Sequence, residues 1–178
     1  MSDHFSKTAF YKELELLLNV SSCEQRKMWA SQIIDKNIDI KYLSNLLKCE
    51  QKVALRFLWL LSDIGISNPK KLFIELPYLL ELLEKHSLNF KTSLASYWLI
   101  AGVPIEDEGR AIDLLFQWLN SNETNVTIKS RSCLVLLNIT KKYPDLKNEL
   151  KLCLINQIDN HSTDFRKRVS KLLIELEA

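Results

Sequence analysis

Glycine, proline and histidine are scarce in this chain of 178 residues, which contains 3 Gly, 4 Pro and 3 His. Sandwiches and barrels need many turns, so the few glycines and prolines argue against them. Disordered chains are poor in apolar residues, so a hydrophobic content of 47% argues against disorder. The most apolar run, from Phe57 to Leu61, is far shorter than the roughly 20 residues that span a bilayer. We expect one domain, large enough to form a core without a metal or disulfide.

Strong charge imbalance is also missing, because 24 Lys and Arg stand against 22 Asp and Glu, for a net charge of +2. Proteins that bind nucleic acid usually carry a larger basic excess. The four cysteines form no CxxC pair, and the first residues lack the basic and apolar segments of a signal peptide. We therefore expect a cytoplasmic protein with free thiols.

Motifs for catalysis or cofactor binding are absent from the sequence. It contains no glycine-rich phosphate loop, no HExxH and no GxSxG. The histidines His4, His86 and His161 are scattered and lack partners at metal-ligand spacing. We expect no metal, no cofactor and a function other than catalysis.

Apolar residues recur at steps of three and four almost throughout, which predicts helices and no strands. Ten helices joined by short polar links would form five helical hairpins. The predicted helices span 4–19, 23–36, 39–48, 50–65, 69–86, 89–102, 105–120, 126–142, 145–159 and 163–177.

Proline and glycine mark the expected helix ends. Pro69, Pro104 and Pro144 fall where helices should begin, because proline fits the first helical turn without loss of a hydrogen bond. Gly65 and Gly102 fall where the preceding helices should end, a position that favours a left-handed backbone.

An internal repeat appears in the second helix of each later hairpin. Four basic residues align at intervals of 39, 38 and 37 residues. The basic residues are Lys52, Lys91, Lys129 and Arg166. The apolar column seven residues later contains Trp59, Trp98, Leu136 and Leu173. These columns predict one buried stripe on each helix, with a basic residue near its start.

Paired helices with a period of about 38 residues and leucine-rich second helices resemble HEAT or armadillo-type repeats. Pro77 inside the helix 69–86 strengthens the resemblance, and the stretch from Trp98 to Trp118 is similar to short bacterial HEAT-like proteins. The resemblance covers residues 38–177 as four hairpins, with 4–36 as a divergent N-terminal capping hairpin. It implies a right-handed α-α superhelix, an α-solenoid, formed by the single domain 1–178.

In such solenoids the second helices line the concave face, so the resemblance implies that a partner binds there. Lys52, Lys91, Lys129 and Arg166 could form a row of cations that holds an acidic peptide or another protein. Trp59 and Trp98 could add an aromatic floor. The alternatives are that the basic residues are solvated or contact neighbouring helices, and that the tryptophans belong to the core. The main hypothesis is a scaffold for protein–protein interaction.

A second hypothesis concerns DNA. Trp59 and Asp63 lie four residues apart and share a helix face, a spacing that resembles the groove of HEAT-like alkylpurine DNA glycosylases. The resemblance implies that Asp63 stabilises charge on the sugar while Trp59 holds the damaged base. No other part of that family's motif is present in the sequence.

The densest basic run lies near the C-terminus, between Asp164 and Lys171. It is interpreted as the polar outer face that a terminal repeat needs for solubility. Binding to a membrane surface would require more apolar bulk, so we expect no membrane partner.

Overall fold

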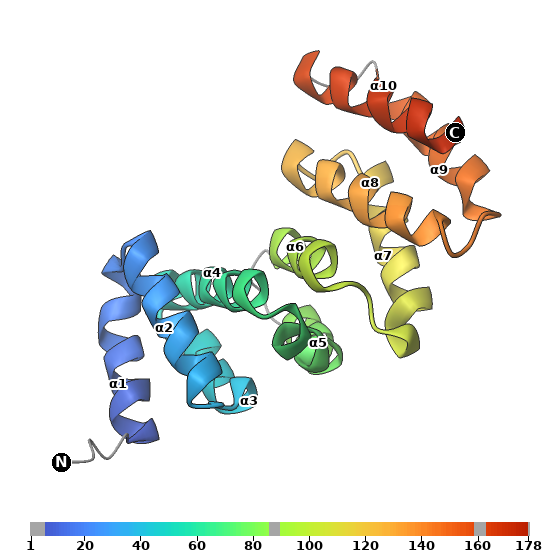
Figure 1. Cartoon of the computed structure of the whole chain (residues 1–178). Helices are drawn as coiled ribbons and strands as arrows, with labels where there is room; N and C mark the ends of the chain where they lie inside the picture. Colours follow the sequence, from blue (N-terminus) through green and yellow to red (C-terminus); the bar gives the residue numbers. More distant parts are fainter. Residues whose placement is uncertain (1–5, 86–89, 159–162, 178) are drawn as a thin grey trace. The chain divides into compact units, whose positions relative to one another are not determined.

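The computed structural model describes residues 6–85, 90–158 and 163–177, and over these residues it is all-helical (Figure 1). The predicted all-α class and the ten predicted helices are confirmed there. The predicted helix ends at 4, 86, 89 and 159, and all three histidines, lie outside the described residues. The helices are α1 Lys7–Leu17, α2 Cys23–Asp35, α3 Ile40–Leu43, α4 Gln51–Ser67, α5 Pro69–Glu84, α6 Lys91–Ala101, α7 Glu108–Asn120, α8 Val126–Thr140, α9 Leu146–Gln157 and α10 Thr163–Glu177. Short 3-10 turns span Leu18–Val20, Ser44–Lys48 and Ile105–Asp107.

Polar side chains fix several helix starts. In each case a side-chain oxygen of the preceding residue accepts a hydrogen bond from a backbone N–H of the first turn, which would otherwise lack a partner. These capping residues are Ser6, Ser22, Asp39, Asn68 and Asn125. They explain why the boundaries predicted at 23, 69 and 126 agree with the structure.

The proline and glycine predictions are partly right. Pro69 is the first residue of α5, and Gly102 follows α6 with φ of 90°, a left-handed conformation that favours glycine. Pro104 instead precedes a 3-10 turn, and Pro144 lies two residues before α9 begins. The prediction for Gly65 is wrong, because Gly65 is buried within α4, which continues to Ser67 until the Asn68–Pro69 pair starts the next helix.

The contacts divide the chain into two compact units, Met1–Ser93 and Leu94–Ala178, with the division in the first turn of α6. In the first unit, α4 packs against both α2 and α5, and α3 contacts α5. Trp29 is fully buried there, and its Nε1 donates a 2.8 Å hydrogen bond to Glu13 Oε1. The helix α4 is therefore the centre of the first unit's core.

In the second unit the contacts follow the order of the chain. Each helix from α7 to α10 contacts the next one, and α7 also contacts α9 while α8 contacts α10. The helices α8 and α10 lie side by side with their first turns at the same end (Figure 1). The buried residues of α10 fall on one stripe that faces the rest of this unit. These residues are Phe165, Val169, Leu172 and Leu176.

The four cysteines agree with the sequence analysis. All four cysteines are free thiols, as their spacing predicted. Burial raises the pKa of the Cys133 thiol to about 12, so Cys133 stays protonated at neutral pH.

Over the described part of the chain, every helix is too short or too polar to cross a membrane.

Candidate functional site

Lys129 does not belong to an exposed row of cations. It lies in the first turns of α8 and is only 1% exposed. Its Nζ donates a 2.6 Å hydrogen bond to the side-chain oxygen of Gln157 on α9, and burial lowers the pKa of its ammonium. The expectation that all four aligned basic residues could face an open groove is therefore wrong for Lys129, because α9 covers its side chain.

The other three basic residues of the column reach solvent to different degrees. Lys52 and Arg166 are exposed, and Lys91 is half-buried. Lys52 and Lys91 belong to the first unit, whereas Arg166 shares the second unit with Lys129. Partner binding by Lys52, Lys91 and Arg166 stays a prediction.

The two aligned tryptophans have different environments. Trp98 is 2% exposed and stacks against Trp118 of α7, with ring centroids 5.9 Å apart and ring planes inclined by 17°. Its indole nitrogen is buried and has no hydrogen-bond partner among the described residues. Trp59 is 49% exposed. Trp98 is thus a core residue, and of the two only Trp59 offers an aromatic surface.

Trp59 and Asp63 lie within a cluster that also contains two arginines. Asp63 Oδ2 accepts a 3.1 Å hydrogen bond from Arg26 Nε of α2, and both side chains are largely buried. The guanidinium groups of Arg26 and Arg56 lie 5.4 Å and 4.5 Å from the Trp59 ring centre. The Asp63 carboxylate therefore already stabilises a cation of the protein itself.

A second charged cluster joins the start of α7 to the link between α8 and α9. Glu108 Oε2 accepts hydrogen bonds from Lys142 Nζ at 2.7 Å and from the Tyr143 hydroxyl at 2.5 Å. These bonds lower the pKa of Glu108, with Lys142 the larger cause. Because Glu108 is bonded to both Lys142 and Tyr143, the cluster is best explained as a structural connection between these two parts of the unit.

We expect Glu108→Gln to lower the melting temperature by a few degrees at pH 7, since it removes charge-assisted hydrogen bonds. A carboxylate with a lowered folded-state pKa contributes stability above its ordinary pKa, and this contribution disappears as pH falls through the folded value. The difference between wild type and variant should therefore shrink in acid. Thermal melts from pH 3 to 7 would test this, and a difference independent of pH would contradict it.

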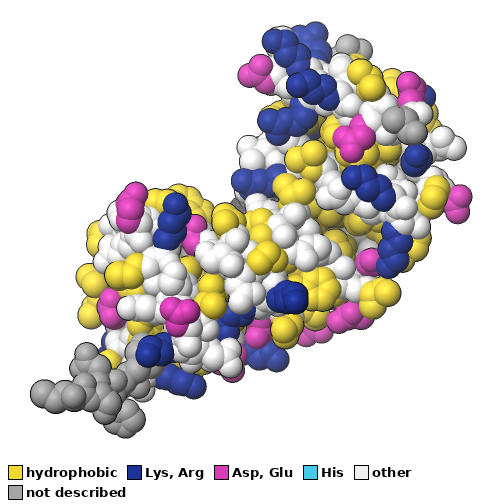
Figure 2. All heavy atoms as spheres, viewed as in Figure 1, with side chains coloured by type: hydrophobic (Ala, Val, Ile, Leu, Met, Phe, Trp, Pro, Cys, Tyr) yellow, Lys and Arg dark blue, Asp and Glu magenta, His cyan; other side chains and the backbone are white. Residues whose placement is uncertain are grey.

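The exposed face of α10 carries four cations that form no ion pair within the described residues. They are Arg166, Lys167, Arg168 and Lys171. In the same unit, three other lysines are each paired with a glutamate. These pairs are Lys141–Glu175, Lys142–Glu108 and Lys151–Glu177. Figure 2 shows Lys and Arg side chains gathered where α10 begins.

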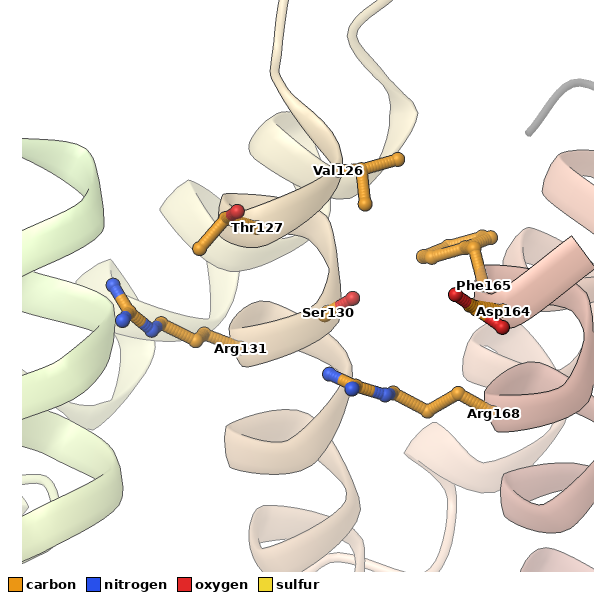
Figure 3. A pocket seen from close by; sticks show the side chains of 7 residues that line it. All are labelled: Val126, Thr127, Ser130, Arg131, Asp164, Phe165 and Arg168. Carbon is orange, nitrogen blue, oxygen red and sulfur yellow. The ribbon is translucent and has the colours of Figure 1, made fainter. Parts of the chain in front are cut away.

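A hollow of about 430 Å³ lies between the first turns of α8 and α10 (Figure 3). We call it the α8–α10 hollow. The Arg168 side chain reaches from α10 toward Ser130 on α8, while Arg131 leaves α8 on the other side in this view. The residues that line the hollow are Val126, Thr127, Ser130, Arg131, Asp164, Phe165 and Arg168. The hollow therefore combines the Ser130 hydroxyl and the Arg168 guanidinium with an apolar wall.

The local field in the α8–α10 hollow favours an anion. The Arg168 guanidinium extends into it, and Arg131 borders it with its guanidinium directed away from α10, against one carboxylate, that of Asp164. The positive end of the α8 dipole adds to this field. Burial lowers the pKa of Arg131 from its usual high value, which does not remove its charge at neutral pH.

Sequence analysis missed the α8–α10 hollow. Ser130 and Arg131 follow the aligned Lys129 directly, and Arg168 lies two residues after the aligned Arg166. The repeat alignment therefore selected the two helices that form the hollow, but it selected Lys129 and Arg166 instead of the adjacent residues that line it. The basic run 164–171 was the available signal, and it was assigned to solubility alone.

Among the described residues, no group of three or more His, Cys, Asp and Glu side chains is placed to hold a metal ion. Comparison with protein-family models, curated proteins and solved structures finds no match. The chain is thus defined here as an all-helical protein with a cationic surface on α10, and the resemblance to HEAT repeats stays a prediction.

Proposed function

We propose that this chain is a cytoplasmic helical-repeat protein of the HEAT or armadillo type that binds an acidic segment of a partner protein and does not catalyse a reaction. In this proposal the hairpins stack into one right-handed superhelix. The contacts of each helix in the second unit with its next and next-but-one neighbours support it, because stacked hairpins bury their apolar faces in this way.

One observation carries the binding proposal: the four cations of α10 have no ion-pair partner among the described residues, although glutamates neutralise other lysines of this unit. Unpaired cations gathered on one surface attract acidic chains and increase their rate of association. The helices α8 and α10 are second helices of their hairpins, which the HEAT resemblance places on the concave face. The proposed partner therefore binds on that face, with Arg166 among its contacts.

This proposal predicts weak, salt-dependent binding of an oligoglutamate peptide, measured by fluorescence anisotropy. Reversing Arg166, Lys167 and Lys171 to Glu should reduce the affinity at least about tenfold, because exposed charges each contribute up to about 1 kcal/mol. The loss should become smaller as salt screens the charges.

A matched control separates this surface from overall charge. Reversing Lys12, Lys27 and Lys70 to Glu changes the net charge by the same amount at three exposed residues of the first unit. The control should retain binding. Equal losses in both triple variants would show that net charge, and not the α10 surface, determines the interaction.

Binding of damaged DNA around Trp59 and Asp63 is the second candidate function, favoured by the half-exposed Trp59 ring beside two arginines. It ranks lower because the Asp63 carboxylate is paired with Arg26. A DNA groove should show affinity that decreases with salt at a log–log slope of about −0.9 per neutralised phosphate. Failure to retain duplex DNA at low salt would remove this candidate.

A further inference from the structure

We infer that the α8–α10 hollow is a binding site for a phosphomonoester group, carried on a phosphorylated side chain of the acidic partner segment. This inference rests on the proposed function, because it assumes that the segment lies along the surface of α10. It adds a specific chemical group and a means of regulation: phosphorylation of the partner would strengthen its binding.

The first observation is an unpaired hydroxyl inside the hollow. Ser130 is 5% exposed, and its side chain has no hydrogen-bond partner among the described residues. Its Oγ is directed from α8 into the space toward α10 (Figure 3). The Ser130 hydroxyl therefore has no protein partner to give up, and a ligand oxygen at this point would accept a hydrogen bond from it.

The second observation is the cation opposite Ser130. The Arg168 guanidinium extends toward Ser130 and forms no ion pair within the described part of the chain. Arginine presents several N–H donors in one plane, which match two oxygens of a phosphate at once. An anion between Ser130 and Arg168 would therefore receive hydrogen bonds from both helices.

The start of α8 supplies further donors. Asn125 caps the N–H of Ile128 at 3.0 Å, whereas the N–H groups of Val126 and Thr127 have no acceptor among the described residues. Thr127 also borders the hollow. Free N–H groups at the first turn of a fifteen-residue helix favour an anion both by hydrogen bonding and through the helix dipole.

The number of donors favours a phosphoryl group over a carboxylate. A phosphomonoester presents three oxygens and nearly two charges, and a carboxylate only two oxygens and one charge. The hollow of about 430 Å³ leaves room for the group and the side chain that carries it, which would contact Phe165 and Val126. The Asp164 carboxylate also lines the hollow and repels an anion, so replacing it with a neutral residue should strengthen phosphate binding.

The test uses three labelled peptides of identical oligoglutamate flanks with serine, glutamate or phosphoserine at the central position. Their affinities for the full chain are measured by anisotropy at fixed salt. We expect the phosphoserine peptide to bind at least about tenfold more tightly than the serine peptide, as charge-assisted bonds to a dianion predict. The glutamate peptide should resemble the serine peptide.

Variants then locate the effect. Arg168→Gln should abolish the advantage of phosphoserine, Ser130→Ala should reduce it, and Asp164→Asn should increase it. Lys70→Gln is the control, since Lys70 is an exposed cation of the first unit that neither lines the hollow nor belongs to the α10 surface. Circular dichroism and melting temperature establish that each variant is folded.

The outcomes separate the inference from the proposed function. Equal binding of all three peptides, or a phosphoserine advantage that survives Arg168→Gln in a folded variant, overturns the phosphate site while leaving acidic binding in place. Absence of binding by all three overturns both. Binding of the phosphoserine peptide alone, lost in Arg168→Gln, supports the phosphate site and contradicts general acidic binding.

Discussion

Lys129→Glu should destabilise the second unit by about 3–5 kcal/mol, because it places a carboxylate where an ammonium now donates to Gln157. The side chain is 1% exposed, so the new charge could not reach water. Urea unfolding followed by circular dichroism would measure the loss as a lower midpoint.

Two further variants test whether the loss of stability in Lys129→Glu comes from the burial of this residue. Lys129→Met removes the buried charge and keeps much of the volume, so its effect should be within about 1.5 kcal/mol of wild type. Lys52→Glu, at the aligned but exposed residue of the first unit, should change stability by about 0.5 kcal/mol or less. Similar losses for Lys129→Glu and Lys52→Glu would contradict the burial of Lys129.

The pH dependence provides an independent readout of the same residue. Burial lowers the pKa of Lys129 in the folded state, so the unfolded chain holds that proton more tightly. Stability rises with pH wherever the unfolded state binds more protons. The stability of wild type relative to Lys129→Met should therefore increase as pH approaches the ordinary lysine value of 10.5.

Trp98→Ala should have an effect of similar size, about 3–5 kcal/mol, because it leaves a cavity beside Trp118 in the core of the second unit. Trp98→Phe should be much milder, since the indole nitrogen has no hydrogen-bond partner to lose. Chemical unfolding of both variants would measure these differences.

The matched control for Trp98 is the aligned tryptophan of the preceding repeat. Trp59→Ala removes a ring that is 49% exposed and contacts two arginine side chains, so about 1 kcal/mol is expected. Equal losses for Trp98→Ala and Trp59→Ala would show that the repeat position, and not the local packing, determines the contribution.

The confirmed predictions of the sequence analysis depend on interactions between residues that are close in the sequence. Apolar residues at steps of three and four predicted the helices, and capping residues such as Ser22 and Asn125 fixed starts within a residue. Gly102 was predicted correctly because its left-handed backbone is a property of one residue. Gly65 was not, since its place inside α4 depends on the cap formed by the following Asn68.

The candidate site illustrates what the repeat alignment missed. Ser130 and Arg168 come from helices whose aligned residues are 37 positions apart, and only the packing of α8 beside α10 brings them to one hollow. Ser130 carries no signal in the sequence, because a serine in a helix is ordinarily exposed or bonded to its own backbone.

The amino-acid sequence by itself determined the helices of the described residues and most of their starts, because periodicity and capping act between residues a few positions apart. The tertiary structure alone decided which side chains reach water. Lys129 and Lys52 occupy equivalent places in the repeat, as do Trp98 and Trp59, but their exposure differs. The exposure of a side chain depends on which helix packs over it. The tertiary fold, and not the residue's place in the repeat, determines that helix.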